Sequence, residues 1–110
     1  MNDAAAPLDR VAWLTHLLRD RFAPVHLEVI DESDLHRGHA GAAAGGGHFR
    51  VLIVSASFGG QSALARQRAV YAHLGEAMGS SVHALALRTL TPDEWQAERA
   101  RQAAGARSNR

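Results

Sequence analysis

The stretch HFRVLIVS, residues 48–55, decides how the rest of this 110-residue chain folds. Apolar residues alternate along one face, as in a β-strand, and they are Phe49, Val51 and Ile53. Leu52 and Val54 on the opposite face indicate that the C-terminal half of the strand is buried on both sides. A turn at FGG (58–60), a helix over 62–78 and a Val- and Leu-rich strand over 80–88 follow. A strand, a helix and a strand in this order predict a right-handed crossover between two parallel strands.

Elements on both sides of this unit complete one domain. Apolar residues at helical spacing predict a helix over about 7–22, which ends before Pro24 because residues preceding proline avoid helical backbone angles. VHLEVID (25–31) alternates as a half-buried strand. The last helix is predicted over 91–102, with Thr91 as its N-cap, Pro92 in its first turn and Glu94 completing a capping box. The order α-β-β-α-β-α predicts an α+β domain over residues 7–102, with a small three-stranded mixed sheet covered by helices.

The ends of the chain and two helix faces carry further expectations. Residues 1–6 and 103–110 are predicted to be flexible. The middle helix is predicted to end at Gly79. Its expected apolar stripe consists of Leu64, Tyr71, Leu74 and Met78, and its expected outward-facing residues include Arg66 and His73. Trp95 is expected to anchor the last helix to the sheet.

The composition excludes several classes of protein. A hydrophobic content of 46% with 21% charged residues is typical of a globular domain, and the net charge of +1 is too small to indicate nucleic-acid binding by itself. The absence of cysteine excludes disulfides and any thiolate ligand from this chain. The N-terminus resembles no signal peptide and the apolar runs are too short for a membrane span, so the sequence predicts a cytoplasmic protein.

Four of the seven histidines are predicted to converge on one edge of the sheet. Parallel strands begin at the same end, so His48 and His83 belong together. The loop over 34–47, which contains HRGHAGAAAGGG, brings His36 and His39 to that end. Imidazoles can bind zinc or copper, and histidines replace cysteines on one iron of some [2Fe-2S] clusters. A site shared with a thiolate-bearing protein suits a chain without cysteine. The alternative is that each of these histidines is a solvated loop or strand-end residue.

The motifs in their order resemble the BolA family. They are LEVIDES (27–33), the His-bearing loop, HFRVLIVSASFGG (48–60), RQRAVYAHL (66–74), VHALAL (82–87) and TPDEW (91–95), so the resemblance covers about residues 8–96. It implies a BolA fold, similar to class II KH domains. The chain departs from the family at Gln67, because the usual motif Arg-His-Arg reads RQR here. It also lacks the GxxG loop of true KH domains.

The resemblance also implies a function and its residues. Family members are partners of monothiol glutaredoxins, with which they form a heterodimer that holds a glutathione-associated [2Fe-2S] cluster, in cluster trafficking or iron regulation. Carried over to this chain, the histidine of VHAL is His83. The loop ligand is His36, three residues after Ser33, with His39 as the alternative because HRGH offers two imidazoles. The free protein is expected to be a monomer or a weak homodimer.

Two other functions are weighed against this one. A DNA-binding transcription regulator of the bacterial stress response, a role attributed to bacterial BolA proteins, would use a basic face. That face carries Arg66 and Arg68, with Arg50 and Arg88 on neighbouring elements. The alternative is that these arginines form a solvated or salt-bridged surface. An enzyme is not expected. A nucleophile elbow or an activated nucleophile does not accompany the residues that could form a hydrolase set, which are Ser55, Ser57, Asp31 and His48.

Overall fold

The computed structural model describes residues 9–33, 47–75, 78 and 82–108. Its elements are α1 (Arg10–Phe22), β1 (His26–Asp31), β2 (Gly47–Val54), the short 3-10 helix η2 (Ala56–Phe58), α3 (Ala63–Leu74), β3 (Val82–Leu90) and α4 (Pro92–Ser108). The strands form one sheet in the order β1-β2-β3, with β1 antiparallel and β3 parallel to β2. The predicted α+β fold, its mixed sheet and the parallel crossover are confirmed.

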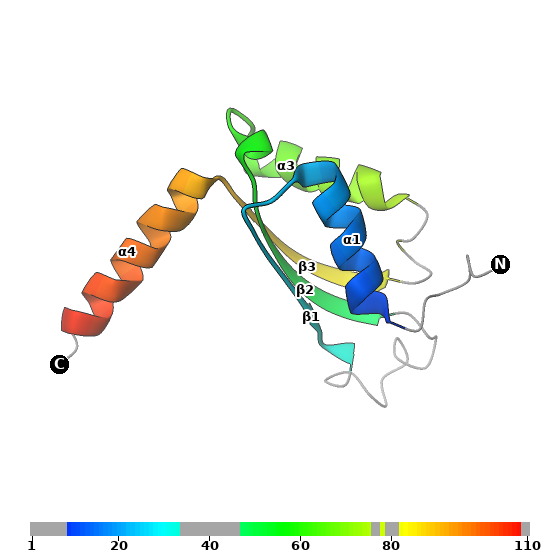
Figure 1. Cartoon of the computed structure of the whole chain (residues 1–110), viewed down its shortest axis with the longest axis horizontal. Helices are drawn as coiled ribbons and strands as arrows, with labels where there is room; N and C mark the ends of the chain where they lie inside the picture. Colours follow the sequence, from blue (N-terminus) through cyan, green and yellow to red (C-terminus); the bar gives the residue numbers. More distant parts are fainter. Residues whose placement is uncertain (1–8, 34–46, 76–77, 79–81, 109–110) are drawn as a thin grey trace.

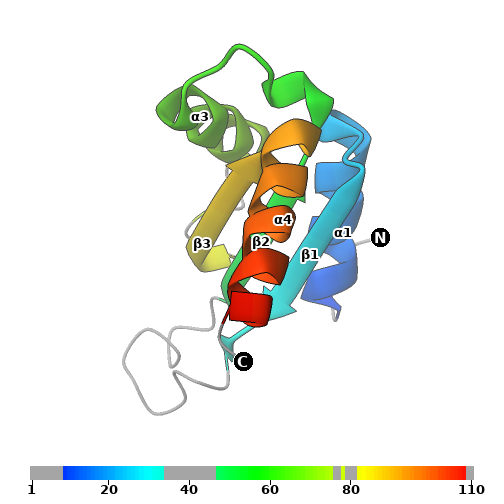
Figure 2. The same cartoon turned by 90° about the vertical axis from the view of Figure 1, so that its left-hand side faces the viewer.

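The helices are distributed unequally over the two faces of the sheet. In Figure 1, α1 and α3 cover one face, here called the inner face, while α4 leads away from the opposite, outer face. Figure 2 shows α4 on the outer side, in front of the sheet. The hydrophobic core fills the space between α1, α3 and the inner face, and it includes Leu14, Leu18, Phe49, Val51, Ile53 and Val70. The outer face is therefore only partly covered.

The boundaries of α1 follow local chemistry. The Asp9 side chain accepts a hydrogen bond from the Ala12 amide at 3.0 Å, which caps the first turn. The helix ends at Ala23, whose positive φ of 44° takes the chain out of the helix just before Pro24, as predicted.

The predictions for α3 are wrong in two respects. The helix ends at Gly75, four residues earlier than Gly79, because Gly75 takes a positive φ of 52° and its amide caps the Tyr71 carbonyl. Its buried face is also different. Leu64 is 59% exposed and Tyr71 is 36% exposed, whereas Arg66 is buried with Val70 and Leu74. The predicted buried face was wrong because hydrophobic spacing assigns every arginine to the surface, whereas Arg66 is buried.

The start of α4 is as predicted, but its end is not. The Thr91 hydroxyl accepts from the Glu94 amide at 3.2 Å, and the Glu94 carboxylate accepts from the Thr91 amide at 2.9 Å. The helix then continues to Ser108 instead of ending at Gln102, so the described part of the predicted tail is helical. Alanine, arginine and glutamine favour helix, and the single Gly105 in this stretch does not end it.

Candidate metal centre

The structure locates the backbone of one predicted cluster ligand. His83 is the second residue of β3, while its side chain, together with all of His36 and His39, lies outside the described residues. Within the described part of the chain, no three His, Asp or Glu side chains form a group that could hold a metal ion. What the structure provides is the position of residue 83 in the sheet.

Residue 83 lies at an irregularity between β2 and β3. Gly47 pairs with Val82 and His48 pairs with Ala84, so the register shifts between Gly47 and His48 and leaves residue 83 without a Cα partner. Such a β-bulge disrupts the ladder locally and changes the direction in which neighbouring side chains project. Position 83 is therefore next to the residues at which the His-bearing loop enters β2.

The base of that loop is held by a small polar network. The Glu32 amide donates to the His48 carbonyl at 2.7 Å, and the His48 amide donates to the Ser33 hydroxyl at 3.1 Å. The Asp31 carboxylate accepts from the Ser33 amide at 2.8 Å. The Glu32 carboxylate also pairs with Arg50 at 2.8 Å, and this hydrogen bond raises the pKa of the Arg50 guanidinium. The two ends of the loop are thus joined to each other, and the Gly47 end lies beside residue 83.

A hollow of about 240 Å³ lies beside this end of the sheet. Its wall on β3 includes Ala84 and Ala86, whose small side chains leave the space open, and the half-buried His48 lines its β2 side. Glu32 also borders it. The hollow gives a group held near residue 83 room beside the sheet.

Arg66, a candidate for nucleic-acid binding, is buried in an ion pair that connects α3 to α4. Its side chain is 10% exposed and makes a bidentate ion pair with Glu94 at 2.7 and 3.1 Å. It also donates to the Gln61 carbonyl at 3.0 Å. The pair lowers the pKa of Glu94 to about 2, chiefly through the hydrogen bond from Arg66 and next through the bond from Thr91. Arg68, the other candidate, is exposed.

Three side chains of α3 bind the open edge of β3, a feature the sequence analysis did not find. Each donates a hydrogen bond to a β3 carbonyl: Arg66 to Thr89 at 3.2 Å, Gln67 to Leu87 at 3.2 Å and Tyr71 to Leu85 at 3.3 Å. The acceptors are every second residue of the strand, so their carbonyls point to the same side, away from β2. We call Arg66, Gln67 and Tyr71 the α3 clamp. It gives Gln67, which departs from the family motif, a defined structural contact.

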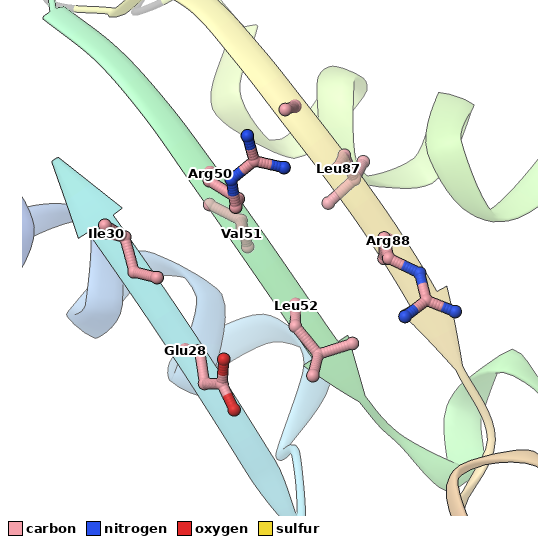
Figure 3. A pocket seen from close by; sticks show the side chains of 8 residues that line it. Glu28, Ile30, Arg50, Val51, Leu52, Leu87 and Arg88 are labelled. Atoms are coloured by element: carbon pink, nitrogen blue, oxygen red, sulfur yellow. The ribbon is translucent and has the colours of Figure 1, made fainter. Parts of the chain in front are cut away.

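The outer face carries a shallow pocket of about 300 Å³ between charged side chains (Figure 3). Figure 3 shows that Glu28 and Ile30 come from β1, Arg50 and Leu52 from β2, and Arg88 from β3. Arg88 pairs with Glu98 of α4 at 2.6 Å, which raises the pKa of Arg88 and lowers that of Glu98. Both arginines that line the pocket are thus engaged in ion pairs with glutamates.

The serine considered for catalysis has a structural contact. The Ser55 hydroxyl is buried and donates to the Phe22 carbonyl at 2.6 Å, which joins the end of α1 to the end of β2. It also accepts from the Ser57 amide at 3.1 Å.

None of the helices that the structure describes has the length and apolar character needed to span a membrane.

Known proteins with similar sequences agree with the motifs. A sequence model of the family described as BolA-like protein matches residues 18–94. The chain belongs to the BolA family. The DNA-binding transcriptional regulator BolA of Escherichia coli (strain K12) is 47% identical over 79 residues, which cover 72% of each chain. The BolA-like protein 1 of Homo sapiens is 43% identical over 79 residues, 72% of this chain and 56% of the human one. These BolA proteins carry the names of regulators or BolA-like proteins, not of enzymes.

Solved BolA structures share the fold. BolA1 from Arabidopsis thaliana superposes with a TM-score of 0.69 at 36% identity, covering 81% of this chain and 98% of that one. The solution structure of BolA1 from Mus musculus superposes with a TM-score of 0.68 at 36% identity, covering 89% of this chain and 77% of that one. The architecture described above is therefore the BolA fold.

Proposed function

We propose that this BolA protein is a non-enzymatic partner of a monothiol glutaredoxin and shares a glutathione-associated [2Fe-2S] cluster with it. The single observation that supports the proposal most is the register of the sheet. Residue 83 lies beside the Gly47–His48 step, where the loop that carries His36 and His39 enters β2. Two imidazoles from these two segments would then reach one metal.

The donor chemistry of the chain supports a shared site over a private one. The chain has seven histidines and no cysteine, so the thiolates of a cluster have to come from another protein and from glutathione. The hollow beside Ala84 and Ala86 leaves space next to position 83 for such a group. Bound in this way, the cluster is cargo that the heterodimer holds for transfer or for sensing iron.

The cluster ligands would be His83 and one loop histidine, His36 or His39. Only a neutral imidazole binds a metal, so the shared cluster is expected to be lost at acidic pH.

Visible circular dichroism tests the proposal. A monothiol glutaredoxin carrying its [2Fe-2S] cluster is titrated without oxygen with the wild type, His83→Ala, His36→Ala and His39→Ala. His16→Ala is the matched control, because His16 is an exposed histidine of α1. The expected result is a changed spectrum that saturates at one to one and is lost with His83→Ala and with one loop variant only. An unchanged spectrum with the wild type overturns the proposal.

A second function, DNA-binding transcription regulation, is supported by the name of the Escherichia coli relative. Of the predicted basic face, Arg66 is buried, and the exposed Arg50 and Arg88 are engaged in ion pairs. Arg68 is therefore the exposed arginine to test first. Fluorescence anisotropy with duplex DNA at several salt concentrations tests it, with Arg19→Ala of α1 as the control for Arg68→Ala. Loss of one phosphate contact lowers the salt slope by about one. Equal slopes for both variants would remove Arg68 from the DNA contact.

A further inference from the structure

The pairing of β3 is irregular near its start: Val82 is buried, pairs with Gly47 and bridges to Met78, and the break in register follows it. Residue 83 has no Cα partner across the bulge, and β3 is an edge strand, so β2 is its only neighbouring strand within the sheet. Beyond the bulge the pairing is regular from His48–Ala84 to Val54–Leu90. Ends of edge strands open more easily than paired interiors. Any ligand at position 83 therefore depends on what fixes the first residues after the bulge.

Tyr71 makes the contact of the α3 clamp that is nearest to position 83. Its hydroxyl donates to the Leu85 carbonyl, two residues after His83, whereas Gln67 binds Leu87, four residues after it. The helix that carries Tyr71 is fixed by core residues on either side of it, Val70 and Leu74, which are 0% and 4% exposed. Tyr71 thus connects the residues just after the bulge to a helix that is anchored in the core.

We propose that Tyr71 is a positioning residue, which holds the start of β3 in place so that the histidine at position 83 keeps its geometry toward the shared cluster. This inference rests on the proposed function. In this role the hydroxyl acts through the backbone of Leu85 and not as a cluster ligand. A net hydrogen bond of this kind changes an equilibrium constant by about fivefold. Without it, the population in which the start of β3 is released should rise by about that factor.

The alternative is that the α3 clamp only stabilises the fold. Two substitutions in the same helix separate these possibilities. Tyr71→Phe removes the hydroxyl and keeps the ring of a residue that is 36% exposed. Ser62→Ala removes the N-cap of α3, whose hydroxyl accepts from the Ala65 amide at 3.1 Å, at the other end of the helix. Both variants lose one hydrogen bond, but only Tyr71→Phe loses a contact with β3.

The experiment has one arm without the cluster and one with it. In the free protein, amide hydrogen exchange followed by NMR should be about fivefold faster at Ala84 and Ala86, whose amides point toward β2, in Tyr71→Phe, and unchanged there in Ser62→Ala. In the complex with a monothiol glutaredoxin, Tyr71→Phe should alter the visible circular dichroism of the [2Fe-2S] cluster and release iron to EDTA two- to about fivefold faster. Ser62→Ala should match the wild type in both cluster readouts.

Each outcome decides a different claim. If the wild-type complex forms and Tyr71→Phe matches it in spectrum and iron release, Tyr71 has no positioning role. The same conclusion follows if both variants change the cluster readouts equally, because the effect is then one of overall stability. If the wild type itself shows no shared cluster, the proposed function fails, and the exchange rates still report whether the hydroxyl holds the start of β3.

Discussion

Replacing Glu94 with glutamine tests the ion pair that connects α3 to α4. Glu94→Gln keeps the size and the capping position of the side chain but removes the charge opposite Arg66. The guanidinium would remain 10% exposed, bonded to two backbone carbonyls but without a counter-charge. Leaving a largely buried charge unpaired is destabilising, so the free energy of unfolding should fall.

The magnitude follows from the carboxyl pKa and its exposure. The decrease from 4.5 to about 2 would correspond to about 3 kcal/mol if the pair were fully shielded from water. The Glu94 side chain is 46% exposed, however, so solvent screening reduces the contribution to about 1–2 kcal/mol. Because the folded-state pKa is lowered, this stabilisation is complete above pH 4.5 and is lost as the pH falls from 4.5 toward 2.

Urea unfolding of wild type and Glu94→Gln at pH 7, 4.5 and 3 measures this effect. The difference in unfolding free energy should be about 1–2 kcal/mol at pH 7 and should decrease at pH 3. Arg66→Met and the double variant complete a double-mutant cycle, in which the coupling energy should follow the same pH dependence. A difference that is constant with pH, or grows on acidification, would refute the assignment of the stabilisation to this ion pair.

Further substitutions test other contacts by urea unfolding. Ser55→Ala should cost about 1–3 kcal/mol because it leaves the Phe22 carbonyl without its donor. Gly75→Ala should destabilise by about 1 kcal/mol because of its positive φ, and Gly105→Ala, inside α4 with open space around a Cβ, should instead stabilise by up to about 1 kcal/mol. Leu18→Ala, at a core position that is 1% exposed, should cost about 2–5 kcal/mol, and a loss below about 1 kcal/mol would contradict its placement.

The sequence predicted those parts of the fold that depend on local chemistry. Alternation in β2 gave the central strand, and the capping box at Thr91 gave the start of α4. The end of α3 could not be chosen in this way, because Gly75 and Gly79 are equally good stop signals and tertiary packing decides between them. The burial of Arg66 was not predictable either, since its partner Glu94 is 28 residues away.

For the candidate metal centre, the sequence predicted only the direction of the strands and therefore which residues lie at the same end of the sheet. Parallel pairing of β2 and β3 placed His48 and His83 at one end of the sheet, and the register agrees with that placement. The bulge at position 83 and the α3 clamp depend on contacts between segments distant in sequence, which no local pattern encodes. The predictions for His36 and His39 lie outside the described residues and remain predictions.

The attachment of α4 has a mechanical consequence. Its first two turns contact three different elements. Glu94 pairs with Arg66 of α3 and Glu98 pairs with Arg88 of β3. The Trp95 ring stacks on His26 of β1, with 4.5 Å between the ring centroids. The helix continues to Ser108, and its 17 residues span about 25 Å. A rotation of about 10° at the base would move the far end by about 4 Å. Because these three contacts set the direction of α4, a small change in the relative positions of the sheet and α3 would produce a larger displacement at the C-terminal end of the helix.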